Sequence, residues 1–321
     1  MTITVLHGDC RSVLPTLAAE SVNCIVTSPP YFGLRSYLPD GHSDKAKEIG
    51  LEQTPDAYVA ELVAVFRECR RALRADGVAF LNLGDSYVSH DPGGHRDGEF
   101  LNPGGRQSAA SKGSRNRAGT HVVGMKRKDL IGIPWMVAFA LRADGWYLRS
   151  DIIFSKPNPM PESVRDRPTK AHEYVFLLTK GERYWYDADA IAEAADLSRA
   201  GKLETSFSTS NPASSLRHDV GRAVMRTETR NARSVWTIAT QPFTGAHFAT
   251  MPPLLAERCI KAGCPAGGMV LDPFGGAGTT ALVADRLGRN ATIIELNPAY
   301  ADMARDRIRG DAPLLAEISA A

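Results

Sequence analysis

The chain alternates between short apolar runs and longer segments in which apolar residues recur every three or four positions. Apolar runs bounded by glycine or polar residues are typical of buried strands, and they lie at 3–6, 22–26, 78–83, 147–154, 173–178, 269–271 and 291–294. The three-to-four spacing is typical of amphipathic helices, and it covers 55–75, 252–261, 279–287 and 299–309. Because strands alternate with helices, the pattern predicts an α/β fold whose mostly parallel sheet is covered on both faces.

Two segments, 86–129 and 196–234, interrupt this pattern. Both are rich in polar residues and lose the apolar periodicity. The first holds eight Lys/Arg against four Asp/Glu, and the second seven against four, so the rest of the chain is net acidic. Polar loops of this length in a compact domain are often functional, and concentrated positive charge favours an anionic partner such as nucleic acid.

Composition places the chain among ordinary globular proteins. It has 321 residues, of which 43% are hydrophobic and 23% charged, and a formal net charge of +2 that by itself indicates no nucleic-acid binding. The five cysteines form neither a Cys-x-x-Cys pair nor a zinc-like cluster, which favours reduced thiols and predicts no metal site. No signal peptide or membrane-spanning run is recognisable, so we expect a cytoplasmic protein without membrane contact.

The strand at 269–271 leads into a glycine turn that opens a helix. Gly276 and Gly278 permit close approach of the backbone to a ligand. Asp272, at the strand end, can accept a hydrogen bond from an ammonium group, and Glu295, at the end of the next strand, suits ribose hydroxyls. Asp9 can accept from an adenine amine. An amino acid, a ribose and an adenine together indicate S-adenosylmethionine (SAM).

Two other interpretations of this turn are open. The glycines can simply make a tight turn that packs the helix on the strand, with Glu295 as a solvent-exposed acid. Nicotinamide or flavin binding is the competing cofactor class, but Asp272 directly before the turn would repel a pyrophosphate there.

A second motif, Ser28-Pro29-Pro30-Tyr31, follows the strand at 22–26. The Ser28 hydroxyl and the Pro29 carbonyl can accept hydrogen bonds from the exocyclic amine of a base, and the two prolines stiffen the backbone that presents them. Tyr31 can stack on the base. The alternative is an ordinary strand-ending turn. With the cofactor motif elsewhere in the chain, the combination predicts methyl transfer to a nucleobase that is flipped out of the duplex.

His172 and Glu173, at the start of a predicted strand, resemble a general-base pair. Methyl transfer from a sulfonium requires alignment more than deprotonation of the amine beforehand. We therefore interpret both side chains as structural.

These motifs resemble those of the SAM-dependent DNA amino-methyltransferases, and specifically the permuted group called beta, in which the catalytic motif precedes the cofactor motif. The likeness covers most of the chain. It implies a doubly wound, mostly parallel seven-stranded sheet, a Rossmann-like methyltransferase fold in circularly permuted order, with a small target-recognition lobe. Beyond the acids and glycines above, it implies cofactor contacts from Phe248, Thr250, Phe274, Thr279, Leu296 and Asn297.

The resemblance also divides the chain into five parts. We expect the catalytic half of the methyltransferase domain at 1–85 and 130–195, and the SAM-binding half at 235–321. The basic insertion at 86–129 and the target-recognition segment at 196–234 would contact DNA.

The implied activity is site-specific methylation of double-stranded DNA. Serine at position 28 favours cytosine N4 as the acceptor, with adenine N6 as the alternative. An RNA or protein amide methyltransferase and a DNA-binding module without catalysis are the other classes considered. A cognate restriction endonuclease and a homodimer are the partners that the resemblance suggests.

Overall fold

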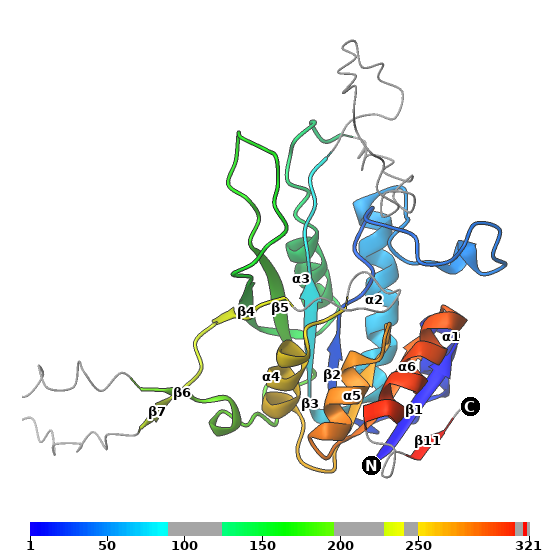
Figure 1. Ribbon diagram of the computed structural model, residues 1–321, viewed down its shortest axis with the longest axis vertical. Helices are drawn as coiled ribbons and strands as arrows, with labels where there is room; N and C mark the ends of the chain where they lie inside the picture. Colours follow the sequence, from blue (N-terminus) through cyan, green and yellow to red (C-terminus); the bar gives the residue numbers. More distant parts are fainter. Residues whose placement is uncertain (89–123, 196–227, 241–249, 312–316, 320–321) are drawn as a thin grey trace, which may run out of the picture.

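The computed structural model describes residues 1–88, 124–195, 228–240, 250–311 and 317–319. A twisted sheet in the strand order β11-β1-β10-β9-β2-β3-β5-β4-β8 forms its centre (Figure 1). The strands are β1 (Thr2–His7), β2 (Val22–Thr27), β3 (Leu73–Leu83), β4 (Tyr147–Ser155), β5 (His172–Thr179), β8 (Val235–Thr237), β9 (Met269–Asp272), β10 (Asn290–Glu295) and β11 (Glu317–Ser319). Neighbouring strands are parallel except that β5 runs antiparallel to both β3 and β4.

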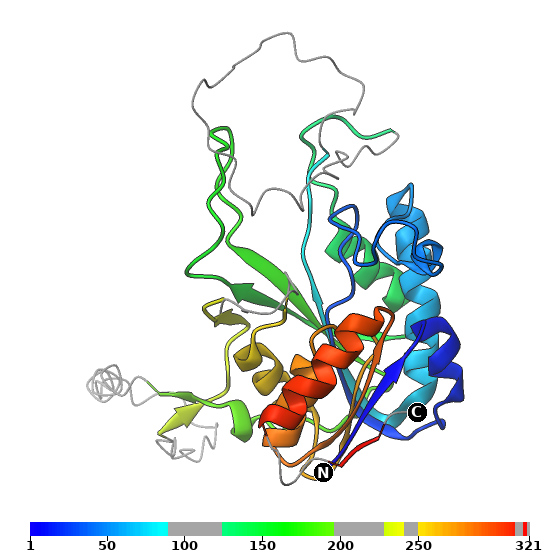
Figure 2. The ribbon, with the colours of Figure 1, turned by 45° about the vertical axis from the view of Figure 1, so that its right-hand side comes forward.

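Helices cover both faces of this sheet (Figures 1 and 2). They are α1 (Cys10–Val13), α2 (Pro55–Ala72), α3 (Ile133–Ala143), α4 (Pro253–Gly263), α5 (Thr279–Arg286) and α6 (Pro298–Asp311). Successive residues of β2 point to opposite sides: Cys24 and Val26 pack with α4 and α5, whereas Ile25 packs with α2 and α3. Two hydrophobic cores therefore sandwich the sheet, which confirms the predicted doubly wound α/β architecture.

The beginning and the end of the chain meet in the middle of the sheet. β2 pairs in parallel with β9, in a register that places Cys24 opposite Val270 and Ile25 opposite Leu271. The carboxyl ends of the two strands consequently lie side by side, although 245 positions separate Thr27 from Asp272. This adjacency brings together the two motifs that lie in permuted order along the chain.

The sheet is wider than predicted, because two three-residue strands, β8 and β11, extend its edges. The predicted α2 begins as its sequence indicates: Thr54 Oγ1 accepts from the Ala57 N–H at 3.2 Å, and Pro55 occupies the first turn. Helix α3 was not predicted.

Most of both basic segments, 89–123 and 196–227, lies outside the described residues. The described residues on either side of 196–227 form a two-stranded ribbon of β6 (Glu193–Ala194) and β7 (Thr229–Arg230). The assignment of these segments to DNA contact stays a prediction. No helix in the described part of the chain is long and apolar enough to cross a membrane.

Candidate active site

A pocket of about 940 Å³, measured with its open mouth, lies at the carboxyl ends of β1, β2, β9 and β10. In a parallel sheet these ends share one edge, which is the usual ligand-binding position of doubly wound folds. The predicted site residues that line it are Asp9, Ser28, Pro30, Thr250, Asp272, Phe274, Gly276, Thr279, Glu295, Leu296 and Asn297.

The other predicted site residues lie differently. Phe248 is outside the described residues, and Pro29 and Tyr31 are absent from the pocket lining. Gly278 is absent from it as well: it precedes α5 with φ of +76°, and a Cβ there would lie 2.8 Å from the Cβ of Ala304 in α6. Its glycine is thus needed for the turn and for close helix packing.

Asp272 is a buried acid at this edge, with 4% of its surface exposed. Its carboxylate accepts hydrogen bonds from Thr27 Oγ1 at 2.6 Å, Thr280 Oγ1 at 2.7 Å and the Phe274 N–H at 3.0 Å. Burial raises its pKa, while these three donors act in the opposite direction. Asp272 therefore ties β2, β9 and α5 together in addition to lining the pocket.

Glu295 lines the pocket at the end of the neighbouring strand, β10. Its carboxylate accepts from the Gly276 N–H at 2.7 Å and from the Asn297 N–H at 2.8 Å, so it fixes the glycine turn against the end of β10. Burial raises the pKa of Glu295 to about 7, although the two backbone donors lower it. This carboxyl therefore titrates near neutral pH.

Asp9, at the end of the pocket next to β1, caps α1 and is paired with Arg11. The Arg11 guanidinium donates to both carboxylate oxygens, with Nη2 2.8 Å from Oδ2 and Nε 3.0 Å from Oδ1. The Arg11 N–H also donates to Oδ1, at 2.9 Å, so an amine of a ligand would share the carboxylate oxygens with Arg11.

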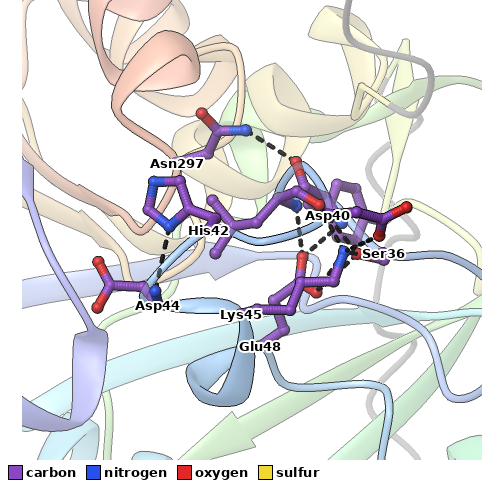
Figure 3. A network of polar contacts seen from close by, with 9 residues as sticks. Ser36, Asp40, His42, Asp44, Lys45, Glu48 and Asn297 are labelled. Carbon is purple, nitrogen blue, oxygen red and sulfur yellow. Dashed lines mark hydrogen bonds and ion pairs between the residues drawn. The ribbon is translucent and has the colours of Figure 1, made fainter.

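A loop from 33 to 50 forms another side of the pocket, which the sequence did not predict. Figure 3 shows its polar contacts. Its centre is Glu48, whose side chain is 2% exposed and accepts from the N–H groups of Tyr37 and Leu38, each at 2.5 Å, and from Ser36 Oγ at 2.7 Å. Asn297 joins this loop to β10, because its amide Nδ2 donates to the Tyr37 carbonyl at 2.8 Å.

The charge of the pocket is acidic. Within the described residues, its lining contains the carboxyl groups of Asp9, Glu48, Asp272 and Glu295 and one amine, that of Lys47. This distribution favours a cationic ligand such as a sulfonium and disfavours a pyrophosphate. No group of three or more His, Cys, Asp or Glu in the described part of the chain could hold a metal ion.

Next to this pocket, Tyr31 is held through its hydroxyl and packed against the backbone. Its hydroxyl donates to Glu173 Oε2 at 2.7 Å, and Asn82 Nδ2 donates to the Tyr31 oxygen at 3.1 Å. The ring is so close to Gly84 that a Cβ there would lie 2.5 Å from Tyr31 Cε2. Glu173 therefore contacts the Tyr31 hydroxyl directly, a contact that the sequence did not predict.

The backbone of the Pro-Pro turn is held from below by α2. The buried Tyr58 hydroxyl donates to the Pro30 carbonyl at 2.7 Å. This bond and the two fixed proline φ angles hold Ser28 and Tyr31 in place at the end of β2. The arrangement matches the preorganisation that a base-binding motif requires.

Comparison with known proteins agrees with this geometry. Residues 22–306 match the N6_N4_Mtase family model, described as DNA methylase. Type II methyltransferase M.SmaI of Serratia marcescens is 44% identical, covering 95% of this chain and 90% of its own length. M.Cfr9I of Citrobacter freundii is 43% identical, with 99% and 91% covered.

Two solved structures have the same fold. TTHA0409 of Thermus thermophilus, complexed with S-adenosyl-L-methionine, superposes with a TM-score of 0.58 at 23% identity over 98% of this chain and 97% of that one. The cytosine-N4-specific PvuII DNA methyltransferase gives 0.60 at 17% identity, over 97% and 92%. Since the family model spans most of the sequence and two relatives exceed 40% identity over nearly its whole length, this chain belongs to the N6/N4 family of DNA methylases.

Proposed function

We propose that this DNA amino-methyltransferase transfers the methyl group of SAM to the N4 amine of a cytosine flipped out of double-stranded DNA. The observation that carries the proposal is the meeting of Ser28 and Asp272 at the adjoining ends of β2 and β9, beside an acid-lined pocket. Serine at position 28 is the reason to favour cytosine. Adenine N6 is the second candidate, since the matched family includes both amines.

The residues in the pocket fit SAM, which supplies a methyl group on a positively charged sulfur. Glu295 would accept from the ribose hydroxyls and Asp9 from the adenine amine. Asp272 would face the ammonium group, and its three internal donors keep its carboxylate in position for this. Phe274 and Leu296 would provide apolar contact. The loop of 33–50, attached to Asn297, would keep water from the cofactor.

The target amine would be held by acceptors. An amine attached to a pyrimidine is a poor nucleophile because its lone pair is delocalised into the ring. Hydrogen bonds from the amine to Ser28 Oγ and the Pro29 carbonyl would favour a pyramidal nitrogen and stabilise the positive charge that develops during transfer. Stacking of the base on Tyr31 would contribute about 1–3 kcal/mol.

Three further assignments belong to this proposal. The basic segments 86–129 and 196–234 would neutralise DNA phosphates and read the target sequence. A cognate endonuclease would recognise the same sequence, in keeping with the type II methyltransferases among the relatives. A homodimer and a cytoplasmic location complete the expected setting.

Mass spectrometry of nucleosides tests the activity directly. The purified protein is incubated with methyl-labelled SAM and unmethylated double-stranded DNA, which is then digested. We expect labelled N4-methylcytosine. Labelled N6-methyladenine would instead identify adenine N6 as the acceptor. The absence of any labelled nucleoside in the DNA digest would overturn the proposal. Labelled RNA or protein in parallel reactions would identify the other substrate classes.

The pKa of Glu295 predicts a pH dependence of cofactor binding. A proton on this carboxyl competes with the ribose hydroxyls for its oxygens, so affinity should rise as pH increases through about 7. Titration calorimetry should give a dissociation constant for SAM about tenfold lower at pH 8 than at pH 6. Glu295→Gln, which has no titrating group here, should lack this increase. An equal increase in both proteins would assign the dependence to another group.

A further inference from the structure

We propose that Glu173 is a positioning residue of the methyl-transfer reaction. It would act through Tyr31 on the Ser28 hydroxyl and accept, at the end of this chain of hydrogen bonds, the proton that the methylated amine loses. The inference rests on the proposed function. It concerns how a serine performs at a position where a carboxylate would be the stronger acceptor.

The directions of the hydrogen bonds follow from the chemistry of the groups. Glu173 Oε2 can only accept when its carboxylate is ionised, so the Tyr31 hydroxyl donates to it across 2.7 Å. The Tyr31 oxygen can then accept, and Ser28 Oγ donates to it at 3.4 Å. Because the serine hydrogen is used in this way, the lone pairs of Ser28 Oγ are left to accept. Asn82 Nδ2 donates to one at 3.5 Å, and the target amine would donate to the other.

The Glu173 carboxylate, the last group in this series of hydrogen bonds, is itself held by two groups. The Lys156 ammonium forms an ion pair with Glu173 Oε1, and Asn82 Nδ2 donates to Oε2 at 3.0 Å. Asn82 is 4% exposed, and the side chains of Lys156 and Glu173 are 21% and 16% exposed. Partial burial strengthens these interactions relative to those at a solvated surface.

The fold explains how these residues meet. Ser28 follows β2, Asn82 lies near the end of β3, and Lys156 follows β4. Glu173 stands near the beginning of β5, which is antiparallel to its neighbours, so this beginning lies at the same edge as the ends of β3 and β4. The register places Tyr174, the next residue, opposite Leu83.

Bonds, charges and protons balance in the transfer step. The amine nitrogen forms a bond to the methyl carbon while the carbon–sulfur bond breaks, and the sulfur keeps the electron pair. The nitrogen, now positively charged, gives one proton to Ser28 Oγ. Ser28 passes its own proton to the Tyr31 oxygen, and Tyr31 passes its proton to Glu173 Oε2. Glu173 ends the step protonated and then releases the proton to solvent. A carboxylate two hydrogen bonds away thereby compensates for the weak acceptor at position 28.

Glu173→Gln tests the proposal, because glutamine preserves the shape but cannot take the proton. With the full-length protein and an unmethylated DNA duplex, we expect the single-turnover rate to fall about 100-fold. The Michaelis constant for DNA and the SAM dissociation constant should stay within about threefold of wild type, because Glu173 is expected to act on the transfer step. Glu162→Gln is the matched control: Glu162 lies on the β4–β5 connection that leads to Glu173, pairs with Arg167 and should be dispensable.

A double-mutant cycle with Tyr31→Phe removes the hydroxyl that links Ser28 to Glu173. If Glu173 acts through Tyr31, adding Glu173→Gln to Tyr31→Phe should slow the reaction by less than about threefold further. Additive losses, or a Glu173→Gln rate near that of wild type, would overturn the inference. Weaker SAM binding or a lower thermal midpoint of unfolding in Glu173→Gln would also overturn the inference, in favour of a role of Glu173 in folding. A wild-type protein that labels no DNA would instead refute the proposed function.

Discussion

Glu295→Ala is expected to weaken SAM binding by about 1,000-fold. The substitution would remove the acceptor proposed for both ribose hydroxyls, and hydrogen bonds to a charged group contribute about 1.5–3 kcal/mol each. It would also leave the N–H groups of Gly276 and Asn297 without their present acceptor, at 2.7 and 2.8 Å. The glycine turn would then lose the contact that fixes it for the ligand.

Titration calorimetry at pH 8, where the wild-type carboxyl is ionised, measures this effect. The control is Glu257→Ala: Glu257 pairs with Lys261 on the half-exposed face of α4, and its loss should leave the affinity unchanged. Glu295→Gln should lie between alanine and wild type, because its one amide oxygen still accepts. A Glu295→Ala protein that binds SAM within tenfold of wild type would show that the ribose is held elsewhere.

The sequence pattern was sufficient to predict that Asp272 and Glu295 lie at one edge of the sheet. Asp272 and Glu295 each end an apolar run in a parallel sheet, and such strand ends share an edge. Placing Ser28 next to these two acids required the order of the strands as well. The resemblance to the permuted family provided that order. Contacts within the 33–50 loop could not be predicted in this way, because they depend on Glu48 folding back onto backbone N–H groups rather than on any periodicity.

The partners of Tyr31 were missed for a different reason. In a fully parallel sheet, the start of the strand that contains Glu173 would lie at the edge opposite to Ser28. The antiparallel direction of β5 reverses this, and neither spacing nor composition reveals strand direction. Helix α3 escaped prediction because its sequence is apolar on nearly all sides, so it has little of the polar stripe by which an amphipathic helix is recognised. Strands of three residues, like β8 and β11, are too short for period-two alternation to be seen.

Asp272→Ala is expected to lower the free energy of unfolding of the cofactor-free protein by about 3 kcal/mol. The change leaves the Thr27 and Thr280 hydroxyls and the Phe274 N–H without their acceptor in a buried place. Each buried unsatisfied donor costs about 1–3 kcal/mol. Two effects reduce the sum: Thr280 Oγ1 can turn fully to the Val26 carbonyl, already 3.3 Å away, and the cost of burying the carboxylate disappears.

Urea denaturation without ligand measures this difference, and the choice of variants separates its causes. Asp272→Asn keeps the volume and one acceptor oxygen, so it should lose about 1 kcal/mol. Asp302→Ala removes a carboxylate that is 72% exposed and pairs with Arg305, and it should stay within about 0.5 kcal/mol of wild type. If Asp272→Ala were as stable as Asp302→Ala, the hydroxyls would have found new acceptors, and Asp272 would serve the ligand alone. A loss near 3 kcal/mol would instead mean that the acid proposed to hold the cofactor also fastens the two motif-bearing strands to each other.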